Sequence, residues 1–380
     1  MRMISCIACV FPSLLGLAAH ADGMDQDRAF SANVTYTGEV VRVLDGGAER
    51  GSAFLGNLDV DLQWTFGEDD GITAYVYLLG NHGEDPSELA GDAQGLSNIT
   101  APNALRVYEA WVKGTLGPVA LKFGLYDLNS EFDVLEVASL FSNSSFGIGP
   151  DYAQAGPMGP SIFPITGVGL RAQVQRDDWY GQVAVIDGQP GDMDDERETS
   201  LRISRHEGAL VAAEVGRVGE TDDGGYYKFS LGTWYFTQRF ERIDDGELER
   251  GNQGAYVSAE GRLAQWGESS LSGFARIGFA NSDLNGVEHY EGAGLVLQGL
   301  PGRPDDRVGV AVARANFSDA ARDLDGLDDN EIAVEINYEL PLTDWLTLQP
   351  NVQRIFTPGG DTALDDAWVV GSRFILTYSR

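Results

Sequence analysis

The chain has 380 residues, with 58 Asp and Glu against 26 Lys and Arg, and its formal net charge is −32 at pH 7. A chain this acidic lacks the basic patches that phosphate contacts need, which excludes nucleic acid as a partner. Both cysteines, Cys6 and Cys9, lie in an apolar run at the N-terminus. If that run is removed, the mature protein has neither a disulfide nor thiol chemistry.

The N-terminus has the features of an export signal. Arg2 precedes the apolar run Ile4–Ala18, and Ala19-His20-Ala21 fits the small-x-small cleavage rule. A membrane anchor is the alternative, but the run is shorter than the roughly 20 apolar residues of a helical span. We therefore predict a cleaved signal peptide over residues 1–21 and a single domain over residues 22–380.

The rest of the chain alternates apolar and polar residues in segments of about ten residues that end at Gly, Asp, Asn or Pro, a pattern typical of β-strands. A segment at Ser200–His206 has charges on both faces, and we place it in a loop after Asp187. That leaves an even number of strands, sixteen, as expected for an exported barrel. The predicted strands are Asn33–Val43, Ala53–Trp64, Ile72–Leu79, Leu105–Lys113, Val119–Tyr126, Thr166–Gln175, Trp179–Asp187, Ala209–Val218, Tyr226–Gln238, Ala255–Leu263, Leu271–Ala280, Tyr290–Gln298, Val308–Phe317, Glu331–Leu340, Leu346–Phe356 and Trp368–Tyr378.

A sandwich and a barrel both show this alternation, so other features must decide between them. Aromatic residues gather at segment ends, as in the girdles of membrane barrels; Trp64, Trp179 and Trp345 are examples. Short connections alternate with long ones, among which Asp127–Pro160 is the longest. These features predict an all-β, antiparallel transmembrane barrel with sixteen strands. Because long loops in compact domains are usually functional, we expect Asp127–Pro160 to fold into the lumen.

Several blocks, in order along nearly the whole mature chain, resemble the carbohydrate-selective porin family of Gram-negative outer membranes. They include Leu105–Val112, Phe123–Phe132, Ser139–Gly147, Pro301–Arg307 and Trp345–Gln353. The resemblance implies a barrel in outer-membrane lipid that admits monosaccharides and similar small solutes by facilitated diffusion. It leaves open whether the channel is a monomer or a homotrimer. A channel without sugar preference, or one that favours cations through its acidic residues, remains the alternative.

A pore that passes sugars needs polar groups to replace water on the hydroxyls and aromatic rings to stack on the C–H face. Conduction also requires weak binding. Strands on both sides of the long segment carry such groups on their polar faces. The predicted pore-lining residues are Glu109, Trp111, Lys113, Lys122, Arg171 and Gln173, and the predicted constriction residues in the long segment are Glu131, Phe132 and Asn143.

Each of these assignments has a simpler alternative. Lys122 and Arg171 can be lumen charges that only form ion pairs, and Trp111 can belong to an interface girdle. The long segment can also be an ordinary solvent-exposed loop.

A barrel hydrolase is the competing function class. It needs an activated nucleophile beside a positioned base. The mature chain offers His82, His206 and His289, all in predicted loops, and its sequence has neither a Gly-x-Ser-x-Gly elbow nor metal-ligand His/Cys spacing. We therefore predict a protein that is not an enzyme and uses neither cofactor nor metal.

Overall fold

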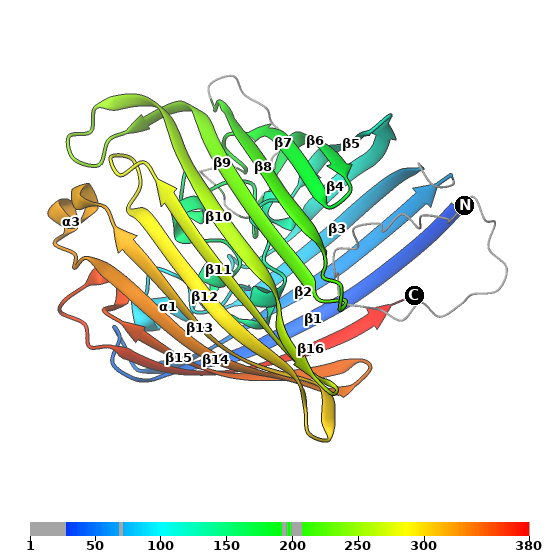
Figure 1. Cartoon of the computed structure of the whole chain (residues 1–380). Coiled ribbons are helices and arrows are strands. Elements are labelled where there is room, and N and C mark those ends of the chain that lie inside the picture. The colour runs from blue at the N-terminus through cyan, green and yellow to red at the C-terminus, as the bar shows by residue number, and fades with distance from the viewer. Residues whose placement is uncertain are drawn as a thin grey trace.

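A computed structural model describes residues 28–67, 71–191 and 207–379, together with Asp195, Arg197 and Thr199. Sixteen antiparallel strands form one closed barrel in which each strand pairs with its sequence neighbours. The first strand closes on the last through a register that runs from Asn33 opposite Ser379 to Asp45 opposite Trp368. Figure 1 shows the resulting tilted cylinder, in which the first and last strands lie side by side. The predicted fold class is confirmed.

All sixteen predicted strands are present, and most are longer than predicted. Backbone pairing continues beyond the apolar stretch of each strand, where alternation can no longer be read from the sequence. The strands are β1 (Arg28–Asp45), β2 (Gly51–Phe66), β3 (Ile72–Gly83), β4 (Ala104–Leu116), β5 (Val119–Tyr126), β6 (Gly167–Arg176), β7 (Trp179–Asp187), β8 (Ala209–Glu220), β9 (Tyr226–Glu241), β10 (Leu248–Trp266), β11 (Ser269–Ala280), β12 (Val287–Leu300), β13 (Arg303–Phe317), β14 (Asn330–Thr343), β15 (Leu346–Phe356) and β16 (Ala367–Ser379).

The longer strands correct the loop placement of two histidines. His82 lies in β3 and contacts Tyr36, and His289 lies in β12 and stacks on Phe279. His206, the segment Ser200–His206 and the predicted signal peptide fall outside the described residues. Neither described histidine is therefore in a loop, because both belong to strand ends that the alternation did not reach.

Helical structure is confined to short pieces in the connections. Four of these pieces lie in the segment between β5 and β6. Among the described residues, no helix is long and apolar enough to cross a membrane. The helices are α1 (Ser87–Ala90), η1 (Leu128–Ser130), η2 (Val137–Leu140), η3 (Ser144–Phe146), α2 (Pro150–Ala153), α3 (Asp319–Asp325) and η4 (Pro358–Gly360).

Side chains alternate between an apolar outer face and an inner face that is rich in polar groups. Outward residues such as Val40, Phe123 and Leu170 are exposed, whereas their inward neighbours Glu39, Lys122 and Arg171 are buried. Apolar exposure of this kind suits a wall that faces hydrocarbon. The inner face is buried because segments of the same chain lie against it.

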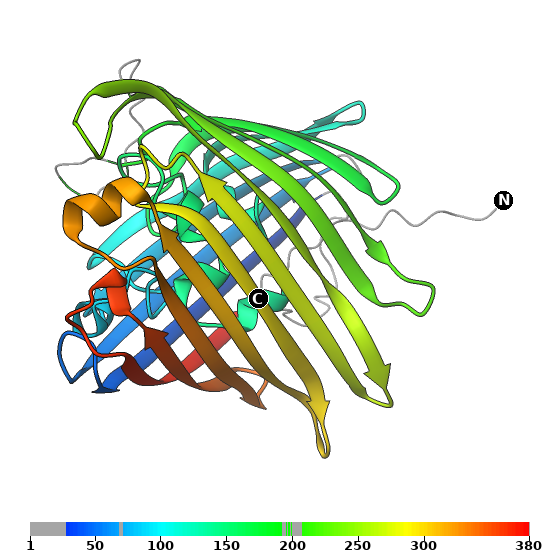
Figure 2. The same cartoon turned by 60° about the vertical axis from the view of Figure 1, so that its left-hand side comes forward.

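Two connections fold into the barrel instead of lying over its rim (Figure 2). They are residues 84–103, here the first inserted segment, and residues 127–166, the second inserted segment. Leu96, Phe141 and Phe146 pack with Val41 and Phe274 of the wall in one apolar cluster. A second cluster joins Leu128, Phe132 and Tyr152 to wall residues such as Trp234 and Phe236. The expectation that Asp127–Pro160 is an ordinary exposed loop is therefore wrong, and its predicted insertion is what the structure shows.

A buried ion pair ties the second inserted segment to β11. The Arg276 guanidinium contacts Asp133 at 2.7 Å and Asp151 at 2.7 Å, and all three side chains are almost fully buried. Its Nε also donates to both carboxylate oxygens of Asp133. Removing one partner of such a group costs about 3–5 kcal/mol, because the remaining charges stay buried without compensation.

We predict that Arg276→Met releases part of the second inserted segment, since Asp133 and Asp151 are then left without their cation. The single-channel ion conductance in a planar bilayer should rise, and its open level should become noisier. Arg217→Met is the matched control, because Arg217 pairs with Asp178 at an exposed turn, where an ion pair is worth about 1 kcal/mol or less. Equal conductance in both variants and wild type would show that Arg276 does not hold the segment in place.

Candidate functional site

The predicted pore-lining residues come together on the inner wall formed by β4 to β6. Lys113 of β4 lies opposite Lys122 of β5, which in turn lies opposite Arg171 of β6. Glu109 and Trp111 share the inner face of β4 with Lys113, as the alternation predicted. The register between β3 and β4 shifts where Tyr77 opposes Glu109 and Leu78 opposes Val107, so Tyr108 is an extra residue there. A bulge of this kind re-aims side chains, and Tyr108 and Glu109 are both buried.

An ion triad joins this wall to the second inserted segment. Glu131 of the segment contacts the Lys122 Nζ at 3.0 Å and the Arg171 Nε at 2.5 Å. The Gln182 amide also donates to the Glu131 carbonyl at 2.6 Å. The side chains of the triad are 2–5% exposed. Lys122 and Arg171 therefore do form ion pairs, as the simpler alternative for these residues stated. Their partner is the predicted constriction residue Glu131.

Trp111 faces inward and not into a lipid-interface girdle. Its ring stacks on Tyr75 with centroids 4.9 Å apart, and the Lys122 ammonium lies 4.1 Å from the ring centroid. Its indole N–H donates to Glu109 at 3.0 Å. The Glu109 carboxylate also accepts from the Asp127 backbone N–H at 3.3 Å. The ring and the carboxylate are therefore held in fixed positions at the start of the inserted segment.

The remaining predicted residues differ in how much surface they keep. Lys113 and Gln173 are half-buried, and Gln173 accepts from Arg171 at 2.7 Å. Phe132 and Asn143 are fully buried. Phe132 packs in the apolar cluster with Trp234, and the Asn143 amide donates to Gln353 of β15. Both side chains of the second inserted segment are covered by their contacts with the barrel wall, so neither has surface that a solute could contact.

Sequence reasoning missed a set of inward side chains on β2 and β3. Tyr75 and Tyr77 lie beside Trp111 and Glu109, and the Tyr77 hydroxyl donates to Asp59 at 2.5 Å. Asp61 accepts from the Asn33 amide at 2.9 Å. The signal was present, because Asp59 and Asp61 alternate with apolar residues along β2, as Tyr75 and Tyr77 do along β3.

The electrostatics at the start of the inserted segment reflect its burial. Burial raises the pKa of the Asp127 carboxyl to about 6, although the Tyr108 hydroxyl and the Asn129 N–H both donate to it. Within the part of the chain that the structure describes, no three His, Cys, Asp or Glu side chains are arranged to hold a metal ion. The site offers hydrogen-bonding groups and ring faces.

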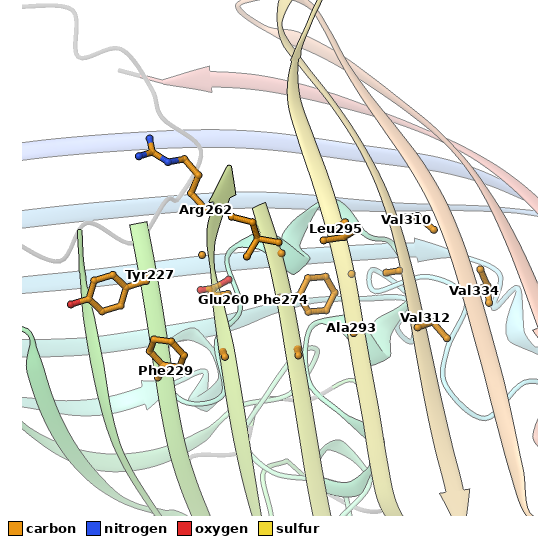
Figure 3. Close-up of a pocket in the computed structure, with 17 residues that line it drawn as sticks. Tyr227, Phe229, Glu260, Arg262, Phe274, Ala293, Leu295, Val310, Val312 and Val334 are labelled. Carbon is orange, nitrogen blue, oxygen red and sulfur yellow. The ribbon is translucent and has the colours of Figure 1, made fainter. Parts of the chain in front are cut away.

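A cavity of about 640 Å³ lies elsewhere, on the outer wall over β9 to β14 (Figure 3). Its rim includes Leu295, Val310 and Val312, which are exposed on the outward face. Small residues such as Gly261 and Gly273 line it as well, and because they have no side chain, the outer surface of the sheet is hollowed there. Because this groove is apolar and outward-facing, it is not a solute site.

Comparisons with known proteins agree with this geometry. Residues 50–378 match the family described as "Carbohydrate-selective porin, OprB family". The chain is 26% identical to Porin B of Pseudomonas aeruginosa, an alignment that covers 97% of this chain and 96% of that protein. The high-pH structure of Pseudomonas putida OprB superimposes with a TM-score of 0.82 at 20% identity, over 93% of this chain and 94% of that one. The outer membrane channel DcaP of Acinetobacter baumannii shares the fold at a TM-score of 0.56 and 11% identity, over 93% of this chain and 98% of that one.

The family match spans most of the chain, and the closed barrel with its polar inner face has the form of a channel. This protein belongs to the carbohydrate-selective porin family of the Gram-negative outer membrane.

Proposed function

We propose that this outer-membrane carbohydrate channel passes monosaccharides and similar small polar solutes by facilitated diffusion past the wall of β3 to β6. The observation that carries the proposal is the arrangement around Trp111. A ring face, a carboxylate and an amide lie on one stretch of inner wall, beside an inserted segment that narrows the lumen. This is the mixture of groups that a sugar ring requires.

The predicted site residues divide into two roles. Glu109, Trp111, Lys113 and Gln173 are the solute-contacting group: Trp111 offers its ring to the C–H face of a sugar, and the others offer donors and acceptors to its hydroxyls. Lys113 and Gln173 keep open surface, and the buried Glu109 accepts from both the Trp111 indole and the Asp127 backbone N–H through Oε2, which leaves its Oε1 as the oxygen for a solute hydroxyl.

Lys122 and Arg171 belong to the positioning group, together with Glu131, Phe132 and Asn143 of the inserted segment. The ion triad fixes the edge of the segment beside Trp111, and the two buried side chains fix its body. A rigid edge keeps the width of the passage constant. The contacts offered to the solute stay few, which keeps binding weak enough for release.

We predict that Glu109→Gln and Arg171→Ala both weaken the block of ion current by glucose in planar bilayers. Glu109→Gln replaces the carboxyl group by an amide, and Arg171→Ala frees the edge that Glu131 forms. A hydrogen bond contributes about 0.5–1.5 kcal/mol, so the apparent affinity should fall about two- to tenfold. Arg217→Ala is the control and should leave the block intact, because Arg217 lies in β8 and forms an exposed ion pair with Asp178. Wild-type block in both site variants would remove the proposed site.

We also predict that liposomes containing the protein swell faster in glucose than in an uncharged non-sugar of equal size. A non-selective pore sorts solutes by size alone, whereas ring and carboxylate contacts raise the local concentration of sugar. The expected rate difference is several-fold and should shrink in Glu109→Gln. Equal swelling rates for the two solutes in wild type would favour a channel without sugar preference.

A further inference from the structure

A series of aromatic rings runs along the inner wall and ends at Trp111. Phe163 of the second inserted segment lies 6.3 Å from Tyr108, and Tyr108 lies 5.0 Å from Tyr77, measured between ring centroids. Tyr77 lies 6.4 Å from Tyr75, and Tyr75 stacks on Trp111 at 4.9 Å. These five rings are called the aromatic path. Each neighbouring pair is in contact range for aromatic side chains.

The strand register orders the aromatic path along the channel. β3 ends at the long-loop end of the barrel, and β4 begins there. Tyr77 therefore lies nearer to that end than Tyr75, and Phe163 lies in the inserted segment that enters from it. The path leads from the long-loop mouth to Trp111, where the proposed solute site begins.

A cavity of about 590 Å³ lies between the two inserted segments, and Phe163, the first ring of the path, is one of its lining residues. Pro102 and Asn103 line it from the first segment, and Met158 and Phe163 from the second. Arg106 holds the two sides together, because its guanidinium donates to the Pro102 and Pro164 carbonyls at 3.3 and 3.2 Å. The cavity thus combines a ring and other apolar surface with an amide, at a size that admits a sugar ring.

The rings of the path differ in exposure in a way that matters for a passing solute. Phe163, Tyr77, Tyr75 and Trp111 are partly exposed, whereas Tyr108 is 3% exposed. Tyr108 is a support, held by its hydroxyl donating to Asp127 at 2.7 Å. The surface that a solute meets inside the channel is therefore Tyr77, Tyr75 and Trp111.

Carboxylates accompany these rings on the neighbouring strand. Asp59 and Asp61 lie on the inner face of β2, opposite the wall positions of β3 that include Tyr77. Among the described residues, neither forms an ion pair with a basic side chain. Asp59 accepts from Tyr77 and Asn57, and Asp61 accepts from Asn33, in each case through Oδ1. Each carboxyl group has a second oxygen, and rings beside carboxyl oxygens are the combination that an uncharged pyranose matches, with its C–H face on the ring and its hydroxyls on the oxygens.

We propose that Tyr75 and Tyr77, with Asp59 and Asp61, form a second sugar subsite that precedes Trp111, fed from the cavity between the inserted segments. This inference rests on the proposed function and extends it. It assigns the selection of pyranose rings over acyclic polyols to two tyrosines outside the constriction. A ring face distinguishes a cyclic solute, which has a flat C–H face, from a flexible acyclic polyol of similar size.

The test is glucose block of the ion current in planar bilayers, measured against block by the acyclic polyol sorbitol. Tyr75→Leu/Tyr77→Leu removes both rings, and Tyr75→Phe/Tyr77→Phe keeps them. We expect the leucine variant to bind glucose about two- to tenfold more weakly, since an aromatic contact is a modest one. Sorbitol should be unaffected in both variants. Phe229→Leu is the control for the loss of an aromatic ring elsewhere in the barrel, because Phe229 is exposed on the outer wall.

The outcomes separate this inference from the proposed function. Wild-type glucose block in the leucine variant, together with weakened block in Glu109→Gln, would overturn the second subsite alone. Equal loss in the phenylalanine and leucine variants would overturn the role of the ring faces. If glucose does not block the wild-type channel, the proposed function fails and the subsite fails with it. If the double leucine variant does not assemble, Tyr75→Leu alone makes the same comparison and keeps the Tyr77 bond to Asp59.

Discussion

Backbone hydrogen bonding between β1 and β16 is the constraint on which the rest of the structure depends. A strand in hydrocarbon has no water for its N–H and C=O groups, so a spanning sheet must close on itself. The antiparallel register of these two strands closes it. Closure fixes which side chains face inward, because the side-chain period is two throughout. Every feature of the lumen follows from that division of faces.

The same requirement applies to the segments inside the barrel, whose backbone amides also need partners. Carboxylates of the wall provide them. Glu335 accepts from the backbone N–H groups of Ser142 and Asn143, and Glu331 from those of Ala93 and Gln94. Three further wall carboxylates make similar contacts. Glu214 accepts from the Asp133 N–H, and Glu260 accepts from the Val137 N–H. Glu39 accepts from the Ser97 hydroxyl of the first inserted segment. Part of the acidic composition is therefore structural, since these acids hold the inserted segments in place and do not line an open passage.

The sequence predicted the strands and their faces because alternation is a local signal. It placed Lys122 and Arg171 on the inner face and put Glu131 in an inserted segment, which was enough to bring the three together. It left ion pairing of Lys122 and Arg171 open as an alternative but did not predict Glu131 as their partner, because contact between residues on different elements depends on the path of the inserted segment. The bulge beside Glu109 was missed for the same kind of reason, since one extra residue leaves no mark in the alternation. The burial of Phe132 and Asn143 was missed because one side of an inserted segment packs against the barrel wall, and the sequence does not show which residues lie on that side.

The ion triad also limits where solute selectivity can lie. Lys122 and Arg171 are almost completely buried, and both are committed to Glu131, so a sugar that competed for them would have to break a buried ion pair. Breaking such a pair costs several kcal/mol, more than a weakly bound solute gains. The proposed function therefore assigns selectivity to the solute-contacting group, Glu109, Trp111, Lys113 and Gln173, and the proposed second subsite adds the two tyrosines of β3. In this proposal Lys122 and Arg171 set the shape of the passage, and the groups beside them select its solute.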